Sequence, residues 1–280
     1  MKIAIASGKG GTGKTTVATN LAINLDQAQL LDCDVEEPNS YLFLQGLELK
    51  KIDEVSIQVP LIDENKCDFC RKCAEFCEYN ALAVVPSKVL FFPELCKGCG
   101  GCSLICPQEA ISEGKKTIGI IEAGQLNGLN LFHGILNLGE PLATPIIKTL
   151  KKKADSSRTL ILDSPPGTAC PMIETVRDAD YCILVTEPTP FGLHDLKIAV
   201  KVVQTLKIPH GIIINRDGIG DDRIEEYCQE ESIPILMKIP NDRKIAHFYS
   251  KGIPFSQEMP EWKEKFRELL EQIKQELTND

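Results

Sequence analysis

Long hydrophobic runs and an excess of positive charge are both missing from this sequence of 280 residues. Its longest apolar runs, such as residues 181–185, are the size of one strand and fall far below the roughly 18 residues of a membrane span. The first apolar residues lead directly into a glycine loop, so we do not expect them to form the core of a signal peptide. The net charge of −9 argues against a general surface for nucleic acid or anionic membranes. We therefore expect a soluble, cytoplasmic protein without stable membrane insertion.

Histidine is scarce as well, and the four histidines lack the spacing of metal ligands. Cysteine, in contrast, is abundant, with twelve residues in a chain long enough to fold without disulfides. Disulfides explain the cysteines poorly, because they are rare in the cytosol and cysteines three residues apart make awkward partners. Eight of the twelve form two copies of C-x2-C-x2-C-x3-C: Cys67, Cys70, Cys73 and Cys77, then Cys96, Cys99, Cys102 and Cys106.

Two kinds of metal site compete to explain this spacing. Paired C-x2-C motifs are common in zinc sites, where four ligands bind one ion. In this sequence, three closely spaced thiols recur twice, and each triplet is followed by a fourth thiol. Three such thiolates can bind three corners of an iron–sulfur cube, while the fourth reaches the other cluster. The spacing favours two [4Fe–4S] clusters and leaves zinc as the alternative.

The cysteine-rich segment resembles bacterial two-cluster ferredoxins, whose motif residues 96–107 match directly. Glu78 departs from that pattern, because proline usually stands there, and the chain path after Cys77 is expected to differ. The resemblance implies an electron-transfer unit with two clusters. Their implied ligands are Cys67, Cys70, Cys73 and Cys106 for the first cluster and Cys96, Cys99, Cys102 and Cys77 for the second.

A glycine loop near the start of the chain forms a second motif. It follows an apolar strand at residues 2–6, fits G-x4-G-K-[ST], and precedes a helical pattern over residues 14–25. Backbone N–H groups of such a loop bind phosphate oxygens, and the helix N-terminus adds partial positive charge. We expect ATP or ADP with Mg²⁺ here, with Lys14 at the β- and γ-phosphates and Thr15 at the metal. The predicted loop is Gly8, Lys9, Gly10, Gly11, Thr12, Gly13, Lys14, Thr15 and Thr16.

The lysine at position 9 makes this loop resemble the deviant Walker motif of the MinD/ParA ATPase family. The resemblance implies ATP hydrolysis and an ATP-dependent homodimer in which Lys9 reaches the nucleotide of the partner subunit. A solvated loop lysine is the alternative for Lys9.

Carboxylates follow two further strand-like runs, and the same resemblance suggests their roles. Asp32 and Asp34 point to the same side of a strand end, and such a pair can hold Mg²⁺-bound water and orient the attacking water. By resemblance, Asp34 positions that water, Asp32 lies nearer the metal, and Asp163 is the Walker B carboxylate. Gly167 would offer its N–H to the γ-phosphate. Asn215 would contact the adenine edge, although asparagine is also an ordinary turn residue. The expected catalytic set is Lys9, Lys14, Asp34 and Asp163.

Strands alternate with helical patterns on both sides of the cysteine segment. This order predicts an α/β fold with a doubly wound, mostly parallel sheet and phosphate at the carboxyl ends of its strands. We predict a P-loop ATPase domain from residues 1–62 and 116–280, and an inserted α+β ferredoxin-like domain at 63–115 with seams near 60–64 and 113–116. The apolar stripe of residues 260–277 is expected to dock on the sheet, because its polar face mixes both charges.

Together the motifs predict an ATPase whose nucleotide switch controls electron transfer or metal-cofactor handling for an unidentified partner protein. The alternative is a carrier or scaffold for iron–sulfur or other metal clusters, in which the ferredoxin clusters are structural and ATP times release. Positioning in the manner of ParA and MinD is a third hypothesis, weakened by the acidic composition. Cys170, shortly after residues 164–167, is a candidate for a redox or metal role.

Overall fold

A sheet of nine strands forms the centre of the protein in the computed structural model, which describes residues 1–279. The strands lie in the order β11-β10-β9-β1-β8-β2-β7-β6-β3. In this order, the strands from β11 to β7 are all parallel to one another, whereas β6 runs antiparallel to both β7 and β3. The mostly parallel α/β sheet is therefore confirmed. The bounds are β1 Lys2–Ala6, β2 Ala28–Asp32, β3 Lys50–Ile62, β6 Ile111–Leu126, β7 Leu129–Leu136, β8 Thr159–Asp163, β9 Tyr181–Thr186, β10 His210–Asp217 and β11 Ile235–Pro240.

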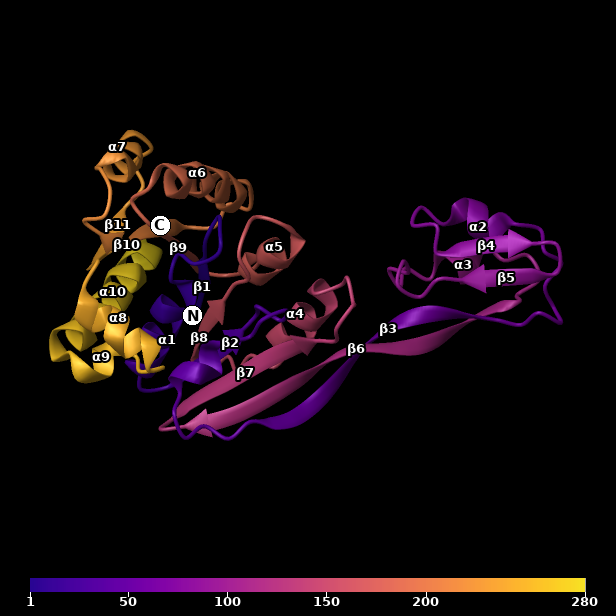
Figure 1. The fold of residues 1–280 in the computed structure, drawn as a ribbon, viewed down its shortest axis with the longest axis horizontal. Coiled ribbons are helices and arrows are strands. Elements are labelled where there is room, and N and C mark those ends of the chain that lie inside the picture. The colour runs from indigo at the N-terminus through magenta and orange to yellow at the C-terminus, as the bar shows by residue number, and fades with distance from the viewer. Residues whose placement is uncertain (280) are drawn as a thin grey trace.

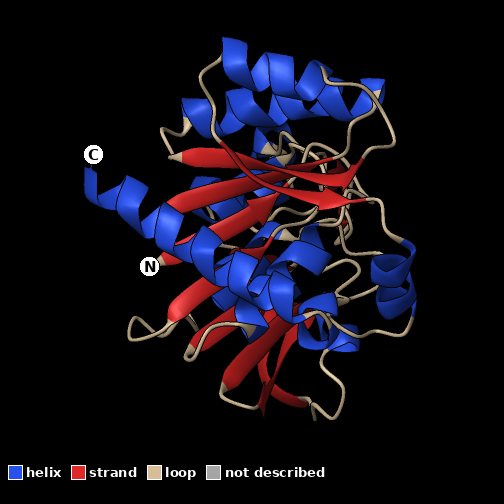
Figure 2. Ribbon diagram, turned by 90° about the vertical axis from the view of Figure 1, so that its left-hand side faces the viewer, coloured by secondary structure: helices blue, strands red, loops and turns tan. Residues whose placement is uncertain are grey.

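Helices cover both faces of this sheet (Figure 2). Alternation along β1 sends Ala4 and Ala6 to one core and Ile3 and Ile5 to the other. The first core includes α4 Thr144–Lys151, α5 Cys170–Val176, α6 Pro190–Thr205 and α7 Arg223–Glu230. The second includes α1 Lys14–Ile23, α8 Arg243–Ser250, α9 Phe255–Glu258 and α10 Pro260–Asn279. Because β1 lies in the centre of the sheet and is covered on both faces, residues 3–6 are all apolar.

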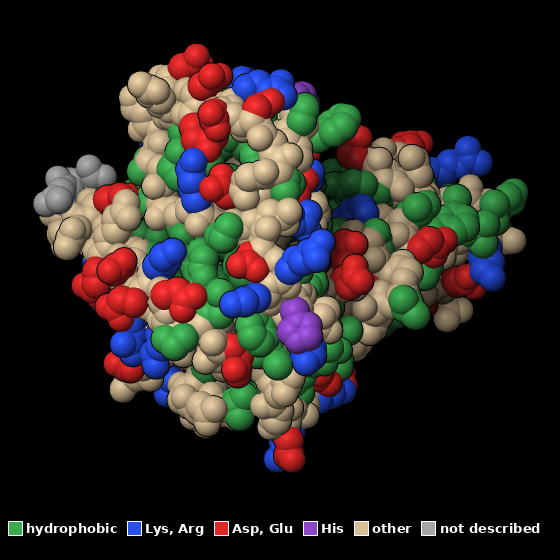
Figure 3. Space-filling view, turned by 60° about the vertical axis from the view of Figure 1, so that its left-hand side comes forward, with side chains coloured by type: hydrophobic (Ala, Val, Ile, Leu, Met, Phe, Trp, Pro, Cys, Tyr) green, Lys and Arg blue, Asp and Glu red, His purple; other side chains and the backbone are tan. Residues whose placement is uncertain are grey.

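The α10 helix confirms the expectation that the C-terminal apolar stripe docks on the body. Trp262, Phe266 and Ile273 are buried in the second core, which also contains side chains of β1 and α1. Figure 3 shows acidic and basic side chains interspersed over one face of the body, without a large patch of either sign. None of the helices described is both long enough and apolar enough to cross a membrane.

A long antiparallel ribbon of β3 and β6 leaves the body and carries a small unit at its far end (Figure 1). That unit contains α2 Lys72–Phe76, β4 Leu82–Val85, β5 Lys88–Phe91 and α3 Gly101–Ile105. The residues expected to form the seams mostly lie inside ribbon strands, since β3 continues to Ile62 and β6 begins at Ile111. Pro60 is compatible with a strand here because β3 is the edge of the sheet, where a missing N–H costs no ladder hydrogen bond.

Candidate functional site

The glycine loop lies between β1 and α1, at the carboxyl end of the sheet, as the strand–loop–helix pattern predicted. Gly13 takes a left-handed conformation with φ of 97°, and a side chain on it would collide with the Asn215 amide at 2.3 Å. That amide donates a hydrogen bond to the Thr12 carbonyl at 2.8 Å. Asn215 thus supports the loop in this structure, and the adenine contact that the resemblance implied stays a prediction.

A cavity of about 350 Å³ opens beside this loop. This volume falls within the usual range for small-molecule sites. Residues from five parts of the chain line it: the glycine loop at 10–16, the segment after β2 at 34–43, Pro166, the end of β10 at 215–216, and the segment from β11 into α8 at 240–249. The topology therefore brings Lys14, Thr15, Asp34 and Asn215 to one cavity, as expected from the sequence.

Lys14 and the carboxylates around it share a buried, mutually charged environment. Burial lowers the pKa of Lys14, and the charges of Asp163 and Asp34 oppose that shift. Burial next to Asp32 raises the pKa of Asp34 to about 6. Burial and the Asp32 charge also raise the pKa of Asp163 to about 8, although the nearby hydroxyl groups of Thr15 and Ser40 lower it. Such displaced pKa values are typical of sites that bind charged ligands.

Asp32 supports the loop that follows its strand. It is fully buried, and the backbone N–H groups of Asp34, Asn39 and Ser40 donate to its oxygens at 3.1, 2.9 and 2.9 Å. Asp32 thus holds the following loop, and its neighbour Asp34 faces the cavity. The place nearer the metal that the resemblance implied for Asp32 stays a prediction.

The residues present fit a bound Mg²⁺. Within the described residues, Asp163 Oδ1 is a buried oxygen without a hydrogen-bond partner, while Oδ2 accepts from the Ser40 hydroxyl at 3.1 Å. Thr15 lines the adjacent cavity and acts on the Asp163 pKa, so a hydroxyl and a carboxylate converge there. Hard oxygen donors of this kind are the ligands that Mg²⁺ prefers, directly or through water.

Lys9 lies beside the loop in an ion pair with Glu187 of the same chain. Glu187 is buried and also pairs with Arg216 at 2.9 Å. The predicted role of Lys9 in a partner subunit stays a prediction. Gly167 takes a left-handed conformation in the loop after β8, with open space where a side chain would stand, so its N–H role also stays a prediction.

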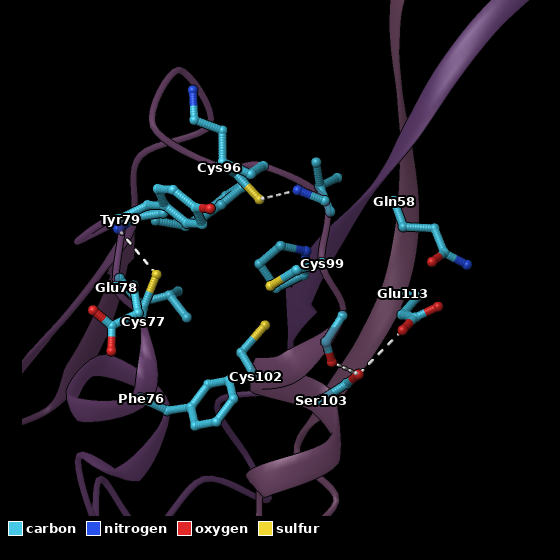
Figure 4. A pocket seen from close by; sticks show the side chains of 18 of the residues that line it. Gln58, Phe76, Cys77, Glu78, Tyr79, Cys96, Cys99, Cys102, Ser103 and Glu113 are labelled. Carbon is cyan, nitrogen blue, oxygen red and sulfur yellow. Dashed lines mark hydrogen bonds between the residues drawn. The ribbon is translucent and has the colours of Figure 1, made fainter. Parts of the chain in front are cut away.

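The eight clustered cysteines gather in two groups of four in the small unit. Cys77, Cys96, Cys99 and Cys102 line a cavity of about 330 Å³, and their sulfur atoms face a common space (Figure 4). The other four line a second, much smaller cavity of about 10 Å³: Cys67, Cys70, Cys73 and Cys106. These are the two sets that the ferredoxin resemblance implied, and cluster ligation by them stays a prediction. Among the residues described, no three His, Cys, Asp or Glu side chains are arranged to hold a single metal ion.

The two groups belong to an internal repeat of 29 residues. Adding 29 to the first motif gives the second, and the backbone follows the same rule, because Arg71 and Gly100 have φ of 68° and 71°. Strand pairing repeats too: Leu82 pairs with Phe91 in the β4–β5 hairpin as Ile111 pairs with Ile62 at the ribbon's end. The repeated unit therefore spans residues 59–114, with the end of the ribbon as its second hairpin. The predicted boundary at residue 63 falls four residues inside this repeated unit. The unit begins within β3, a strand that also belongs to the large sheet, so the sequence gives no sign of its start.

The chemistry of this donor set fits thiolate-bound clusters. The N–H groups of Ala81 and Ala110 donate to the sulfurs of Cys77 and Cys106, both at 3.3 Å, and these contacts are equivalent in the repeat. Hydrogen bonds to sulfur are among the groups that tune iron–sulfur clusters. Burial raises the pKa of Cys73, so its thiolate needs a positive centre for stabilisation.

Comparison with known proteins decides the family. A model of the CobQ/CobB/MinD/ParA nucleotide binding domain matches residues 3–255. The chain belongs to this family. An uncharacterised protein of Methanocaldococcus jannaschii is 38% identical over 261 residues, which make up 91% of each chain. The iron-sulfur cluster carrier protein of Pyrococcus horikoshii is 26% identical over 274 residues, covering 90% of this chain and 78% of the carrier.

Solved structures of MinD share the fold of this CobQ/CobB/MinD/ParA member. MinD of Pyrococcus horikoshii, complexed with Mg-ADP, has a TM-score of 0.60 at 20% identity and covers 97% of this chain and 95% of its own. MinD of Pyrococcus furiosus has a TM-score of 0.58 at 22% identity, with 98% of each chain covered. The predicted MinD/ParA-type nucleotide-binding fold is thus confirmed, and the insertion of a ferredoxin-like domain into it stays a prediction.

Sequence reasoning missed two polar residues at the nucleotide site of this family member. Ser40 contacts Asp163, which lies 123 residues away, and Glu187 contacts Lys9, which lies 178 residues away. Neither residue stands in a motif of fixed spacing. Glu187 could have been found from its position directly after the buried strand β9, because the carboxyl ends of parallel strands meet at the edge of the sheet where the glycine loop lies.

Proposed function

We propose that this protein is an ATP-dependent carrier of iron–sulfur clusters. The observation that carries the proposal is the joining of two four-cysteine groups to a nucleotide-binding body by one continuous ribbon. Relatives named iron-sulfur cluster carrier proteins, 25–26% identical over about 90% of this chain, support it over electron transfer.

In this proposal ATP and Mg²⁺ bind in the cavity beside the glycine loop. Lys14 binds the β- and γ-phosphates, Thr15 and Asp163 hold the metal, and Asp34 orients the attacking water for in-line phosphoryl transfer. Gly167 donates its N–H to the γ-phosphate. Lys9 leaves Glu187 and completes the phosphate site of a second copy, so that ATP favours a homodimer.

The small unit, residues 59–114, holds two [4Fe–4S] clusters on the two cysteine groups as resident parts of a ferredoxin-like domain. When bound, these clusters supply one-electron redox capacity. The nucleotide cycle then times the release of a cluster or metal cargo to an acceptor protein.

The test uses anaerobically purified protein loaded with labelled iron, together with an apo-ferredoxin as the acceptor. We expect ATP to accelerate transfer of labelled cluster to the acceptor, and we expect the Lys14→Ala variant to show no acceleration. Equal transfer with and without ATP would contradict the carrier function.

Electron delivery is a second candidate, favoured by the internal repeat and the paired cysteine groups of the small unit. It predicts that ATP changes the rate at which reduced protein passes electrons to a dye while its iron content stays constant. That result, together with absent cluster transfer, would replace the carrier function by electron delivery.

A further inference from the structure

We propose that Ser40 is a positioning residue that links the loop after β2 to the metal-binding carboxylate Asp163. Through this link, the loop and Mg²⁺–nucleotide stabilise each other. The inference rests on the proposed binding of Mg²⁺–ATP, and it adds a residue that the glycine-loop and carboxylate motifs do not contain.

Ser40 contacts two buried carboxylates at once. It is fully buried at the start of the 3₁₀ turn η1, Ser40–Phe43. Its backbone N–H donates to Asp32 Oδ2 at 2.9 Å, and its hydroxyl donates to Asp163 Oδ2 at 3.1 Å. These carboxylates end the neighbouring strands β2 and β8, where Asp32 and Asp163 are paired in register. One serine therefore bridges the ends of two central strands.

The hydroxyl contact fixes which oxygen of Asp163 is available. Since Oδ2 accepts from Ser40, rotation of the carboxylate is restricted, and Oδ1 is held as the buried oxygen without a partner among the described residues. Oδ1 is then the atom that can accept from water on Mg²⁺ or bind the metal itself. A serine that orients this carboxylate contributes to metal binding without touching the metal.

The backbone contact joins this carboxylate to the loop. Residues 34, 39 and 40 all donate N–H groups to Asp32, so the loop from Asp34 to Ser40 is held as one piece. The same piece presents Asp34 and Asn39 to the nucleotide cavity. A nucleotide that contacts this loop therefore stabilises the Ser40 hydroxyl beside Asp163, and Mg²⁺ at Asp163 stabilises the loop. Such mutual stabilisation must be equal in both directions.

The experiment compares ATP affinity with excess Mg²⁺ and with EDTA in wild-type, Ser40→Ala and Ser40→Thr proteins. Hydrogen bonds to charged groups contribute enough that we expect Ser40→Ala to lose about tenfold of the Mg²⁺-dependent increase in affinity. Its affinity in EDTA should equal that of the wild type, and Ser40→Thr, which keeps the hydroxyl, should recover most of the increase. Ser256→Ala is the matched control, because Ser256 is equally buried and lies in α9, on the second core.

The outcomes separate this inference from the proposed function. An unchanged Mg²⁺-dependent increase in Ser40→Ala, or an equal loss with and without Mg²⁺, would overturn the positioning role. Wild-type protein that binds no Mg²⁺–ATP would overturn the proposed function itself. If Ser40→Ala does not fold, amide hydrogen exchange of wild-type protein decides. Adding Mg²⁺ to the ATP-bound protein must slow exchange over residues 34–43, and unchanged exchange there refutes the link.

Discussion

Replacing Asp163 by asparagine is expected to stabilise the protein when metal and nucleotide are removed. Asp163 is buried, and burial beside Asp32 raises its pKa from 3.8 to about 8 in the folded state. The folded protein therefore binds a proton more tightly than the unfolded chain, and the stability from this group is complete below pH 4 and is lost as the pH rises through 8. Asparagine keeps the shape and carries no charge, so the variant does not lose this stability.

The size of the effect follows from the separation of the two pKa values. At about 1.4 kcal/mol per unit, a separation of about four units sets an upper limit of about 6 kcal/mol. Relaxation around a buried charge lowers this limit, and we expect a gain of about 2–4 kcal/mol for Asp163→Asn at pH 8. The gain in free energy of unfolding should decrease steadily as the pH is lowered towards 4. The same substitution should weaken Mg²⁺–ATP binding, because the carboxylate that destabilises the free protein is the one that we propose binds the metal.

Urea unfolding in EDTA measures this difference between pH 4.5 and 8. The chain has one tryptophan, Trp262, which is 3% exposed and reports on the core of the body. Asp155→Asn is the control, because hydrogen bonding from Ser157 lowers the pKa of that exposed carboxylate and the pH trend should not follow that of Asp163. A gain for Asp163→Asn that is the same at pH 4.5 and 8, or a loss at pH 8, would refute the reasoning.

The other predictions concern three parts of the molecule. Lys14→Ala should abolish tight Mg²⁺–ATP binding in equilibrium titrations, whereas Asp34→Ala should retain binding and slow single-turnover hydrolysis. Wild-type hydrolysis should fall as the pH drops through about 6, because protonated Asp34 cannot orient water, and a flat profile would remove it from that role. Phe266→Ala should cost about 3–5 kcal/mol of unfolding free energy by urea titration, since this ring of α10 is fully buried in the second core; a loss below 1 kcal/mol would contradict its place in the core. Cys70→Ser should lower the iron content of anaerobic protein from about eight to about four per chain, and zinc without sulfide in the wild type would contradict the clusters.

Features fixed by neighbouring residues could be predicted from the sequence. The glycine loop needed only an apolar strand before it and a helix after it, and the docking of α10 needed only the period of its apolar side chains. The ribbon could not be predicted, because Pro60 and Gly114 are typical of turns and become strand residues only when β3 and β6 pair.

The roles of individual polar residues depended on contacts between distant parts of the chain. Asp32 stands at a strand end like a metal ligand, but the loop that follows folds back and uses both of its oxygens. Asn215 similarly supports Thr12 across the sheet edge. In each case the residue was found by its motif, and its partner was set by tertiary packing.

The β3–β6 ribbon extends beyond its neighbour β7, and this free end forms a lever arm for the cysteine unit. Pairing between β6 and β7 begins at Gly119, and the segment after β7 still contacts Ile118 and Thr117 through Asn137 and Lys116 through Glu140. Residues 111–115 of β6 extend beyond these contacts, paired with β3. At about 3.4 Å per residue, this overhang is about 17 Å long, and a tilt of about 5° at the sheet edge displaces its tip by about 1.5 Å. Because side chains alternate across a strand, removing two residues from each ribbon strand shortens the arm by about 7 Å and keeps its facing, whereas removing one turns the cysteine unit over. The reach of the cysteines therefore changes in steps of two residues.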